Sequence, residues 1–296
     1  MTRSKKESLQ GVAIITPILI SFTIFTVVPL AMLFWYSFRN YNIIKRADEF
    51  NGLTNYIRIF TRQEYLSSLG TTILMAVILT FVSVVVSFFV GLGCVKAKTH
   101  QALLRTIWYI PSLIPIYVIT AILNNMLATD GTLNRLMEFF GLPAQSWYRN
   151  TFWMYFWIIF VTAWRGIGGT SLLFIAALGS VDQSVYEAAN LDGATGLKRI
   201  WYITIPLIKP MFSFILINAF IGACQIFEPV LFISEGGPDQ TTKVILYRIY
   251  DEAFWNGKMG FACALSVVVT LFIMIFSITG MIISDSDMLK IKEGEL

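Results

Sequence analysis

Six segments of the chain are each long and apolar enough to cross a lipid bilayer, and no other feature constrains the fold as strongly. A spanning helix needs about 20 mostly apolar residues, because each residue adds about 1.5 Å to a helix and the hydrocarbon core is about 30 Å thick. The six segments comprise residues 11–36, 70–95, 104–127, 151–178, 205–234 and 259–284. Charged residues make up 14% of the chain, against about 25% in a soluble domain. We therefore expect an all-α integral membrane protein, with residues 1–296 forming a single transmembrane domain.

The first apolar segment is interpreted as a retained helix and not as a secretory signal. Arg3, Lys5 and Lys6 precede it, but its apolar run is longer than the roughly 7–15 residues of a signal peptide, and no small-x-small cleavage site follows. Six spans place both termini on one side of the membrane. Lysine and arginine are almost evenly divided between the two sides, but the short basic loop from Lys96 to Arg105 favours cytoplasmic termini.

The remaining composition argues against several other classes of protein. The three cysteines, Cys94, Cys224 and Cys263, lie in apolar segments without a CxxC pair, and His100 has no Cys or His neighbour. No metal site is therefore expected. Lysine and arginine form no continuous run, which argues against nucleic-acid binding. A membrane enzyme would need clustered acid–base groups, and the carboxylates here are scattered.

The longest polar loop, residues 180–206, is predicted to form a helix–turn–helix on the inner membrane surface. Ser180 followed by Gln183 fits a capping box, so a helix can begin there. Apolar and small residues then share one helical face: Val181, Val185, Ala188 and Ala189. Gly193 can adopt the left-handed conformation that ends helices, and a second helix over 197–202 leads to Pro206, which suits a first helical turn. Such an element could transmit a push from a soluble partner; an amphipathic connector on the lipid headgroups is the alternative.

This loop resembles the EAA motif of binding-protein-dependent ABC importer permeases. The matching positions are Glu187-Ala188-Ala189, Asp192-Gly193-Ala194 and Ile203-x-Ile205-Pro206. Ile205 stands where the motif usually has Leu. Val181-Asp182 stands where an Ile-Pro start to the helix is common, and capping by Ser180 or Asp182 could substitute for it. The resemblance extends over nearly the whole chain: the Gly52-Leu53-x-Asn55-Tyr56 segment and the Gly236-Gly237-Pro238 turn are similar to the MalF-type subunit of the carbohydrate-uptake (maltose and glycerol-phosphate-like) family.

The resemblance implies a fold and a coupling site. The implied fold is that of a type I ABC importer permease: six transmembrane helices with a cytoplasmic coupling helix between helices 4 and 5. In that family the EAA loop sits in a groove of the ATPase subunit, so Glu187 and Gly193 would hold its geometry while Ala188 and Ala189 fit the groove. The coupling-loop residues implied in this way are Glu187, Ala188, Ala189, Asp192, Gly193, Ala194, Ile203 and Pro206.

The resemblance also implies partners. The chain has no GxxxxGK[ST] phosphate-binding loop, so we expect a permease subunit, not an enzyme, with ATP and Mg bound by a separate ATPase and no cofactor on this chain. The implied partners are a second homologous permease, two cytoplasmic ATPase subunits and an extracytoplasmic solute-binding protein, in a bacterial-type cytoplasmic (inner) membrane. The implied solute is a sugar or oligosaccharide. Glycerol-phosphate, polyol or acidic-sugar uptake is the alternative, and a secondary transporter, which would need internal repeats, is less favoured.

Polar residues within the spans mark a candidate solute pathway, because such groups are costly in lipid and usually face a cavity or the bundle interior. Asn218, Gln225 and Glu228 fall on one face of the fifth span at spacings of seven and three. We hypothesise that they line the pathway and hydrogen-bond a polyhydroxylated solute; the alternative is interhelical polar contact. Arg165 lies near the middle of the fourth span. It could pair with a partner's carboxylate, orient the cavity or contact an acidic solute.

Overall fold

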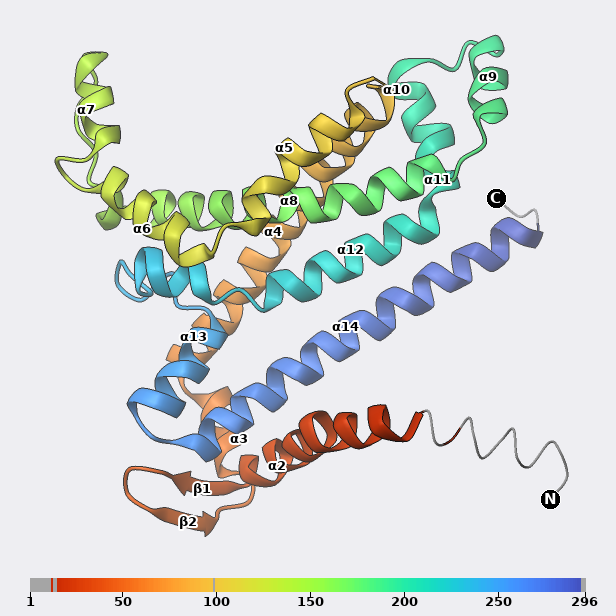
Figure 1. The fold of residues 1–296 in the computed structure, drawn as a ribbon. Coiled ribbons are helices and arrows are strands. Elements are labelled where there is room, and N and C mark those ends of the chain that lie inside the picture. Colours follow the sequence, from red (N-terminus) through yellow and green to blue (C-terminus); the bar gives the residue numbers. More distant parts are fainter. Residues whose placement is uncertain (1–11, 13–14, 98, 294–296) are drawn as a thin grey trace, which may run out of the picture. The chain divides into compact units, whose positions relative to one another are not determined.

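The computed structural model describes residue 12, residues 15–97 and residues 99–293, with side chains as far as residue 284. Arg3, Lys5, Lys6 and residues 11, 13 and 14 of the first expected span lie outside these residues. The chain divides into two compact units, Met1–Leu66 with Arg248–Leu271 and Ser67–Tyr247 with Phe272–Leu296. Each unit consists mainly of helices (Figure 1).

The first unit contains a long helix, a β-hairpin and a short amphipathic helix. The long helix, Ile15–Ser37, includes the π-helical turn Thr23–Val27 and α2 (Val28–Ser37). Strands β1 (Arg39–Asn42) and β2 (Ala47–Phe50) pair antiparallel, with Arg39 opposite Phe50. Helix α3 (Thr54–Thr61) follows the hairpin. The π-helical turn Asp251–Trp255 precedes the last helix, α14 (Met259–Glu293). Gly260 lets the hairpin approach α14 closely, because a Cβ there would meet the carbonyl oxygen of Arg39.

A buried carboxylate joins three segments of this unit. Glu252, 7% exposed, accepts a hydrogen bond from the Tyr65 hydroxyl at 2.7 Å and pairs with Lys258 Nζ at 3.1 Å. The Arg58 guanidinium lies 4.6 Å from the centre of the Phe261 ring. Burial alone would raise the pKa of Glu252, but the hydrogen bonds from Tyr65 and Lys258 outweigh it and hold the pKa below its ordinary value.

The second unit contains most of the remaining helices, and three helices run through both units. The helices are α4 (Gln63–Lys96), α5 (Gln101–Leu113), α6 (Ile116–Leu127), α7 (Thr132–Phe139), α8 (Thr151–Gly179), α9 (Gln183–Leu191), α10 (Gly196–Arg199), α11 (Ile205–Leu207), α12 (Lys209–Cys224), α13 (Ile245–Tyr250) and α14 (Met259–Glu293). A 3-10 turn occurs at Trp147–Arg149, and π-helical turns occur at Ile200–Thr204 and Val230–Ser234. Helices α4, α13 and α14 are the ones that continue across the unit boundary.

Within the described residues, four helices are long and apolar enough to cross a membrane by themselves. They are Ile15–Ser37, Gln63–Lys96, Thr151–Gly179 and Met259–Ser284. Two bent pairs also qualify, Gln101–Leu113 with Ile116–Leu127 and Gly196–Leu207 with Lys209–Cys224, and each pair is bent by 84°. Counting each bent pair as one span gives six, in the regions where the sequence predicts them.

The two bent spans differ from the continuous helices expected over 104–127 and 205–234. The first breaks at Ile114, which is extended because it precedes Pro115. The second bends at Ile208, between α11 and α12. Helix α12 then ends at Cys224, well before the expected residue 234. A helix that continued would bring the Pro229 ring against the carbonyl of Gln225, four residues earlier. The chain instead turns and resumes in the π-helical segment Val230–Ser234.

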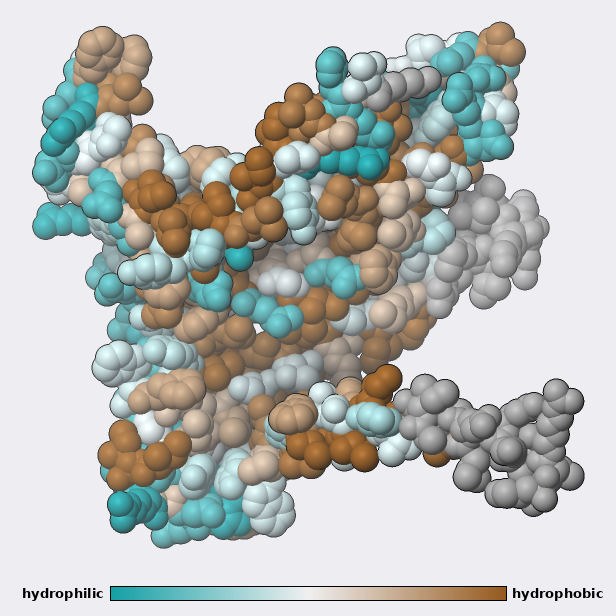
Figure 2. All heavy atoms as spheres, in the orientation of Figure 1, coloured by the Kyte–Doolittle hydropathy of each residue, from teal (hydrophilic) through white to brown (hydrophobic). Residues whose placement is uncertain are grey.

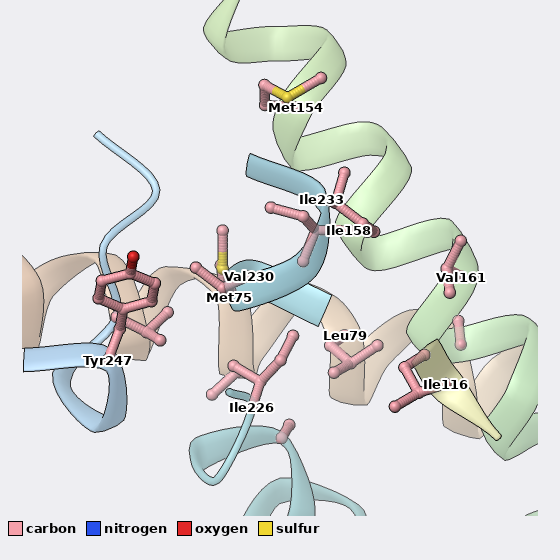
Figure 3. Packing of buried hydrophobic residues seen from close by; sticks show 14 of the residues in the cluster. Met75, Leu79, Ile116, Met154, Ile158, Val161, Ile226, Val230, Ile233 and Tyr247 are labelled. Carbon is pink, nitrogen blue, oxygen red and sulfur yellow. The ribbon is translucent and has the colours of Figure 1, made fainter. Parts of the chain in front are cut away.

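The core of the second unit joins α4, α6, α8 and the segments that follow α12 (Figure 3). Labelled members are Met75, Leu79, Ile116, Met154, Ile158, Val161, Ile226, Val230, Ile233 and Tyr247. Two glycines let helix backbones approach one another: a Cβ at Gly91 would lie 2.9 Å from Phe174 Cβ, and one at Gly168 would lie 2.7 Å from Tyr109 Cα. Helices α4 and α5 therefore both pack closely on α8.

The connection between α6 and α8 is held by one buried amide. Asn134, 1% exposed, donates from Nδ2 to the carbonyls of Thr129 and Gln145, at 3.0 and 3.1 Å. Its Oδ1 accepts from the Gln145 backbone N–H and from Trp147 Nε1, both at 3.0 Å. All four hydrogen bonds of this amide are thus satisfied, which fixes α7 against the turn at Trp147–Arg149.

Candidate coupling loop and central cavity

Helix α9 begins at Asp182. The Asp182 carboxylate accepts a hydrogen bond from Ser184 N–H at 2.8 Å, and this bond holds the pKa of the exposed carboxyl below its ordinary value. The expected Ser180–Gln183 capping box does not form. The Ser180 hydroxyl instead donates to the Ala177 carbonyl at 2.8 Å and belongs to the end of α8. Helix α9 is thus separated from α8 by a link of only three residues, 180–182.

Helix α9 ends at the predicted glycine in a Schellman motif. Gly193 has φ +74°, Ala194 N–H donates to the Ala189 carbonyl at 2.8 Å, and Gly193 N–H donates to the Asn190 carbonyl at 3.2 Å. These two bonds satisfy carbonyls that the helix end would otherwise leave open. The motif explains why glycine is needed at position 193.

The faces of α9 are sorted by burial. Ala189 is 5% exposed, whereas Glu187 and Ala188 are exposed, and Gln183 Nε2 donates to Glu187 Oε1 at 2.9 Å. Arg199 connects α9 to α10, because its Nη1 donates to Asn190 Oδ1 at 3.2 Å and its guanidinium lies 5.5 Å from the centre of the Tyr186 ring. The loop is therefore a braced unit with Ala188 and Glu187 on its open side.

The surface of α9 is mostly hydrophilic (Figure 2), but several large apolar side chains of the loop are exposed. Leu191 is 90% exposed and Tyr202 is 80% exposed, and Leu197 and Trp201 are also open. Of the remaining predicted residues, Asp192 and Pro206 are exposed, and Ala194 and Ile203 are half-buried. Exposed apolar groups in a polar loop are typical of a surface that meets another protein.

A cavity of about 620 Å³ lies beside the break between α5 and α6 and the C-terminal end of α12. It is lined by Arg165, Gln225 and Glu228 together with Thr162, Ser112 and neighbouring apolar residues. Arg165 Nε donates to the Ile114 carbonyl at 3.3 Å, where the α5–α6 break removes a helical hydrogen bond. Gln225 Nε2 donates to the Ile221 carbonyl at 3.1 Å as α12 ends. The helix breaks therefore set the positions of both polar side chains.

Three of the four predicted pathway residues line this cavity, and Asn218 does not. Asn218 is exposed on α12 and its Nδ2 donates to the Phe214 carbonyl of the same helix at 2.9 Å. Sequence reasoning did not find Ser112 or the Ile114 carbonyl, although Pro115 marks the break that exposes them. Within the described residues, no three His, Cys, Asp or Glu side chains are grouped as metal ligands would be.

Comparison with known proteins identifies the class. Residues 83–285 match the sequence model of one protein family, the binding-protein-dependent transport system inner membrane component. The chain belongs to this family. The probable ABC transporter permease protein YesP of Bacillus subtilis (strain 168) is 32% identical over 274 residues, covering 91% of this chain and 88% of the relative. The arabinooligosaccharides transport system permease protein AraP of Halalkalibacterium halodurans is 30% identical over 270 residues, covering 90% and 84%.

A solved structure shares the fold. A bacterial alginate ABC transporter in complex with an alginate pentasaccharide-bound periplasmic protein matches with a TM-score of 0.81 and 20% identity, over 94% of each chain. The predicted all-α membrane fold of an ABC importer permease is thereby confirmed, as is the family resemblance carried by the EAA-like motif.

Proposed function

We propose that this chain is the permease subunit of an ATP-driven, binding-protein-dependent importer of a sugar or oligosaccharide. Membership of the family supports the transport role. A relative named for arabinooligosaccharides and a structural neighbour that carries alginate support the carbohydrate class. The proposed setting is a bacterial cytoplasmic membrane with both termini in the cytoplasm, so α9 and the loop after α4 face inward.

The braced loop from α9 to α11 is the observation that carries this proposal. Its exposed side presents Glu187 and Ala188, and two large apolar side chains of the same loop, Leu191 and Tyr202, are also exposed. We assign this surface to the groove of a cytoplasmic ATPase subunit, which binds ATP and Mg. A second homologous permease, a second ATPase and an extracytoplasmic solute-binding protein complete the proposed assembly.

The cavity around Arg165, Gln225 and Glu228 is assigned to the solute pathway. An amide, a carboxylate and a guanidinium in one cavity of about 620 Å³ offer both donors and acceptors to a polyhydroxylated solute. Arg165 also favours a second candidate, an acidic sugar or a phosphorylated polyol. Within the described residues its one hydrogen bond leaves from Nε, so the Nη groups are free to bind an anionic oxygen.

The coupling assignment is tested by charge reversal at Glu187. The chain is reconstituted with its partner permease, ATPase and binding protein in proteoliposomes, and ATP-dependent uptake is measured. Glu187→Lys should abolish uptake while the permease pair still inserts, whereas Glu138→Lys, the same exposed reversal on α7, should not. Uptake driven by an ion gradient without the ATPase would overturn the assignment and favour a secondary transporter.

The pathway assignment is tested in the same vesicles with single alanine variants. Gln225→Ala and Glu228→Ala should each raise the KM for uptake, because both residues line the cavity. Asn218→Ala serves as the matched polar deletion on the same helix but away from the cavity. Equal effects at all three positions, or none at any, would contradict the assignment of this cavity.

A further inference from the structure

A second concave surface lies between the C-terminal half of α4 and the beginning of α5, away from the candidate solute cavity. This groove, called here the α4–α5 groove, has a volume of about 440 Å³. Its walls include Val86, Phe89, Val90 and Gly93 from α4 and Leu104 and Trp108 from α5. Its lining is apolar almost throughout, and Phe89 is exposed in it.

The groove follows from how the two helices pack. Helices α4 and α5 are consecutive, with only residues 97–100 between them (Figure 1), and each contacts α8 closely at a glycine. Gly91 brings α4 against Phe174, and Gly168 brings α8 against the α5 backbone at Tyr109. Two helices held side by side on a third leave a furrow between them.

Positive charge gathers at the end of this groove where α4 stops and α5 starts. Lys96 is the exposed last residue of α4, and Arg105 follows the groove residue Leu104. Arg105 acts electrostatically on the groove residue Cys94. Residues 65–129 contain no Asp or Glu, and in the described part of the chain neither Lys96 nor Arg105 forms an ion pair.

One of these charges lacks a hydrogen-bond acceptor. Arg105 Nε is buried and has no hydrogen-bond partner in the described part of the chain. A buried donor without an acceptor is costly, and more so on a charged group. Arg105 as a whole is half-buried, so an anionic oxygen bound at this end of the groove would stabilise its guanidinium.

We propose that the α4–α5 groove binds an anionic phospholipid, with an acyl chain along Phe89, Val90 and Trp108 and the phosphate at Arg105 and Lys96. The match is one of chemistry: an apolar furrow on two membrane-spanning helices ends in cations that pair with no carboxylate among the described residues, as an anionic amphiphile requires. Its location in the inner leaflet rests on the orientation proposed above. The furrow and its basic end do not depend on that orientation.

The first experiment measures lipid retention by the purified permease complex in detergent, using native mass spectrometry with added phosphatidylglycerol or phosphatidylcholine. The wild type should retain phosphatidylglycerol preferentially. Arg105→Gln should weaken that binding about fivefold, since a basic residue near a lipid phosphate contributes on the order of that factor. Arg62→Gln, which removes an exposed arginine on another part of the chain, should leave it unchanged.

A second variant fills the groove without touching its charges. A side chain at Gly93 meets no atom within 4 Å at its Cβ, so Gly93→Leu should fold and should displace the acyl chain. Phosphatidylglycerol with a photoreactive acyl chain should label peptides within 85–108 in the wild type and not in Gly93→Leu. The proposal would be overturned by any of three results. Phosphatidylglycerol retention could be unaffected by both variants, the two lipids could be retained equally, or this segment could cross-link to the partner permease in place of lipid.

These measurements use no solute and no ATP. Loss of lipid retention with intact uptake, or the reverse, therefore separates this proposal from the transport function proposed for the chain. Both proposals fail together only if the purified complex itself does not assemble, which size-exclusion chromatography of each variant detects.

Discussion

Replacing Gly193 by alanine should loosen the end of α9 without any steric clash. A Cβ at Gly193 meets no atom within 4 Å, so the whole cost comes from the backbone, whose φ is +74°. The left-handed conformation costs a non-glycine residue about 1–2 kcal/mol, a factor of roughly 5–30 in population. The Schellman bonds from Gly193 N–H and Ala194 N–H should open more often by that factor.

Hydrogen–deuterium exchange of residues 183–196 in the assembled permease measures this opening directly. Gly193→Ala should accelerate exchange about 5- to 30-fold, and Gly193→Asn less, because asparagine tolerates the left-handed region. Gly179→Ala is the matched control: it also has open space around its Cβ but lies at the end of α8 without a positive φ. That variant should slow local exchange, since alanine favours helix. Equal acceleration at both positions would refute the conformational argument.

Three further perturbations address the rest of the fold. Asn134→Ala leaves the buried Trp147 indole and the half-buried Gln145 N–H without their acceptor. It should destabilise the α6–α8 connection by about 3 kcal/mol and speed proteolysis there, whereas Asn125→Ala, whose amide bonds only its own helix, should not. Gly168→Ala should cost about 1–3 kcal/mol of folding free energy and so lower the melting temperature in detergent. Gly169→Ala, which has open space at its Cβ, should not. Equal melting temperatures for the two variants would contradict the close α5–α8 contact. The pKa of Glu252 in the folded protein lies below its ordinary value of 4.5. Its contribution to the free energy of unfolding should therefore be complete above pH 4.5 and should fall as the pH drops through the folded-state pKa. Glu252→Gln should cost about 1.5–3 kcal/mol at neutral pH and flatten the pH dependence of unfolding; a pH profile identical to that of the wild type would contradict the argument.

The spans and the helix–turn–helix of residues 180–206 could be predicted because their signals are local. Long apolar runs identify the spans, and an Asp-Gly pair after a helical pattern identifies the end of α9 at Gly193. At the start of α9 the sequence offers two capping residues, Ser180 and Asp182, and the capping box at Ser180 is the wrong one of the two. Only the path of α8 decides that Ser180 belongs to the end of that helix. Local propensity cannot settle such a choice.

The candidate cavity was less predictable because it depends on where helices break. A helical wheel places Asn218 on the face of Gln225 and Glu228 only if the helix continues to residue 228. The structure ends α12 at Cys224, so Gln225 and Glu228 enter the cavity and Asn218 does not. Pro229 carries the relevant signal. The role of the Ile114 carbonyl as the acceptor of Arg165 needs the fold, because the two residues come from different spans.

The close glycine contact at Gly168 couples the movement of α8 to that of α5. Because no side chain lies between the two backbones at this contact, α5 has to follow when α8 is displaced there. Arg165 lies three residues before Gly168, and its Nε donates to the carbonyl of Ile114, the residue that directly follows α5. A movement of α9 that displaces α8 would therefore carry Arg165 and its acceptor together, and so would change the cavity wall as one unit.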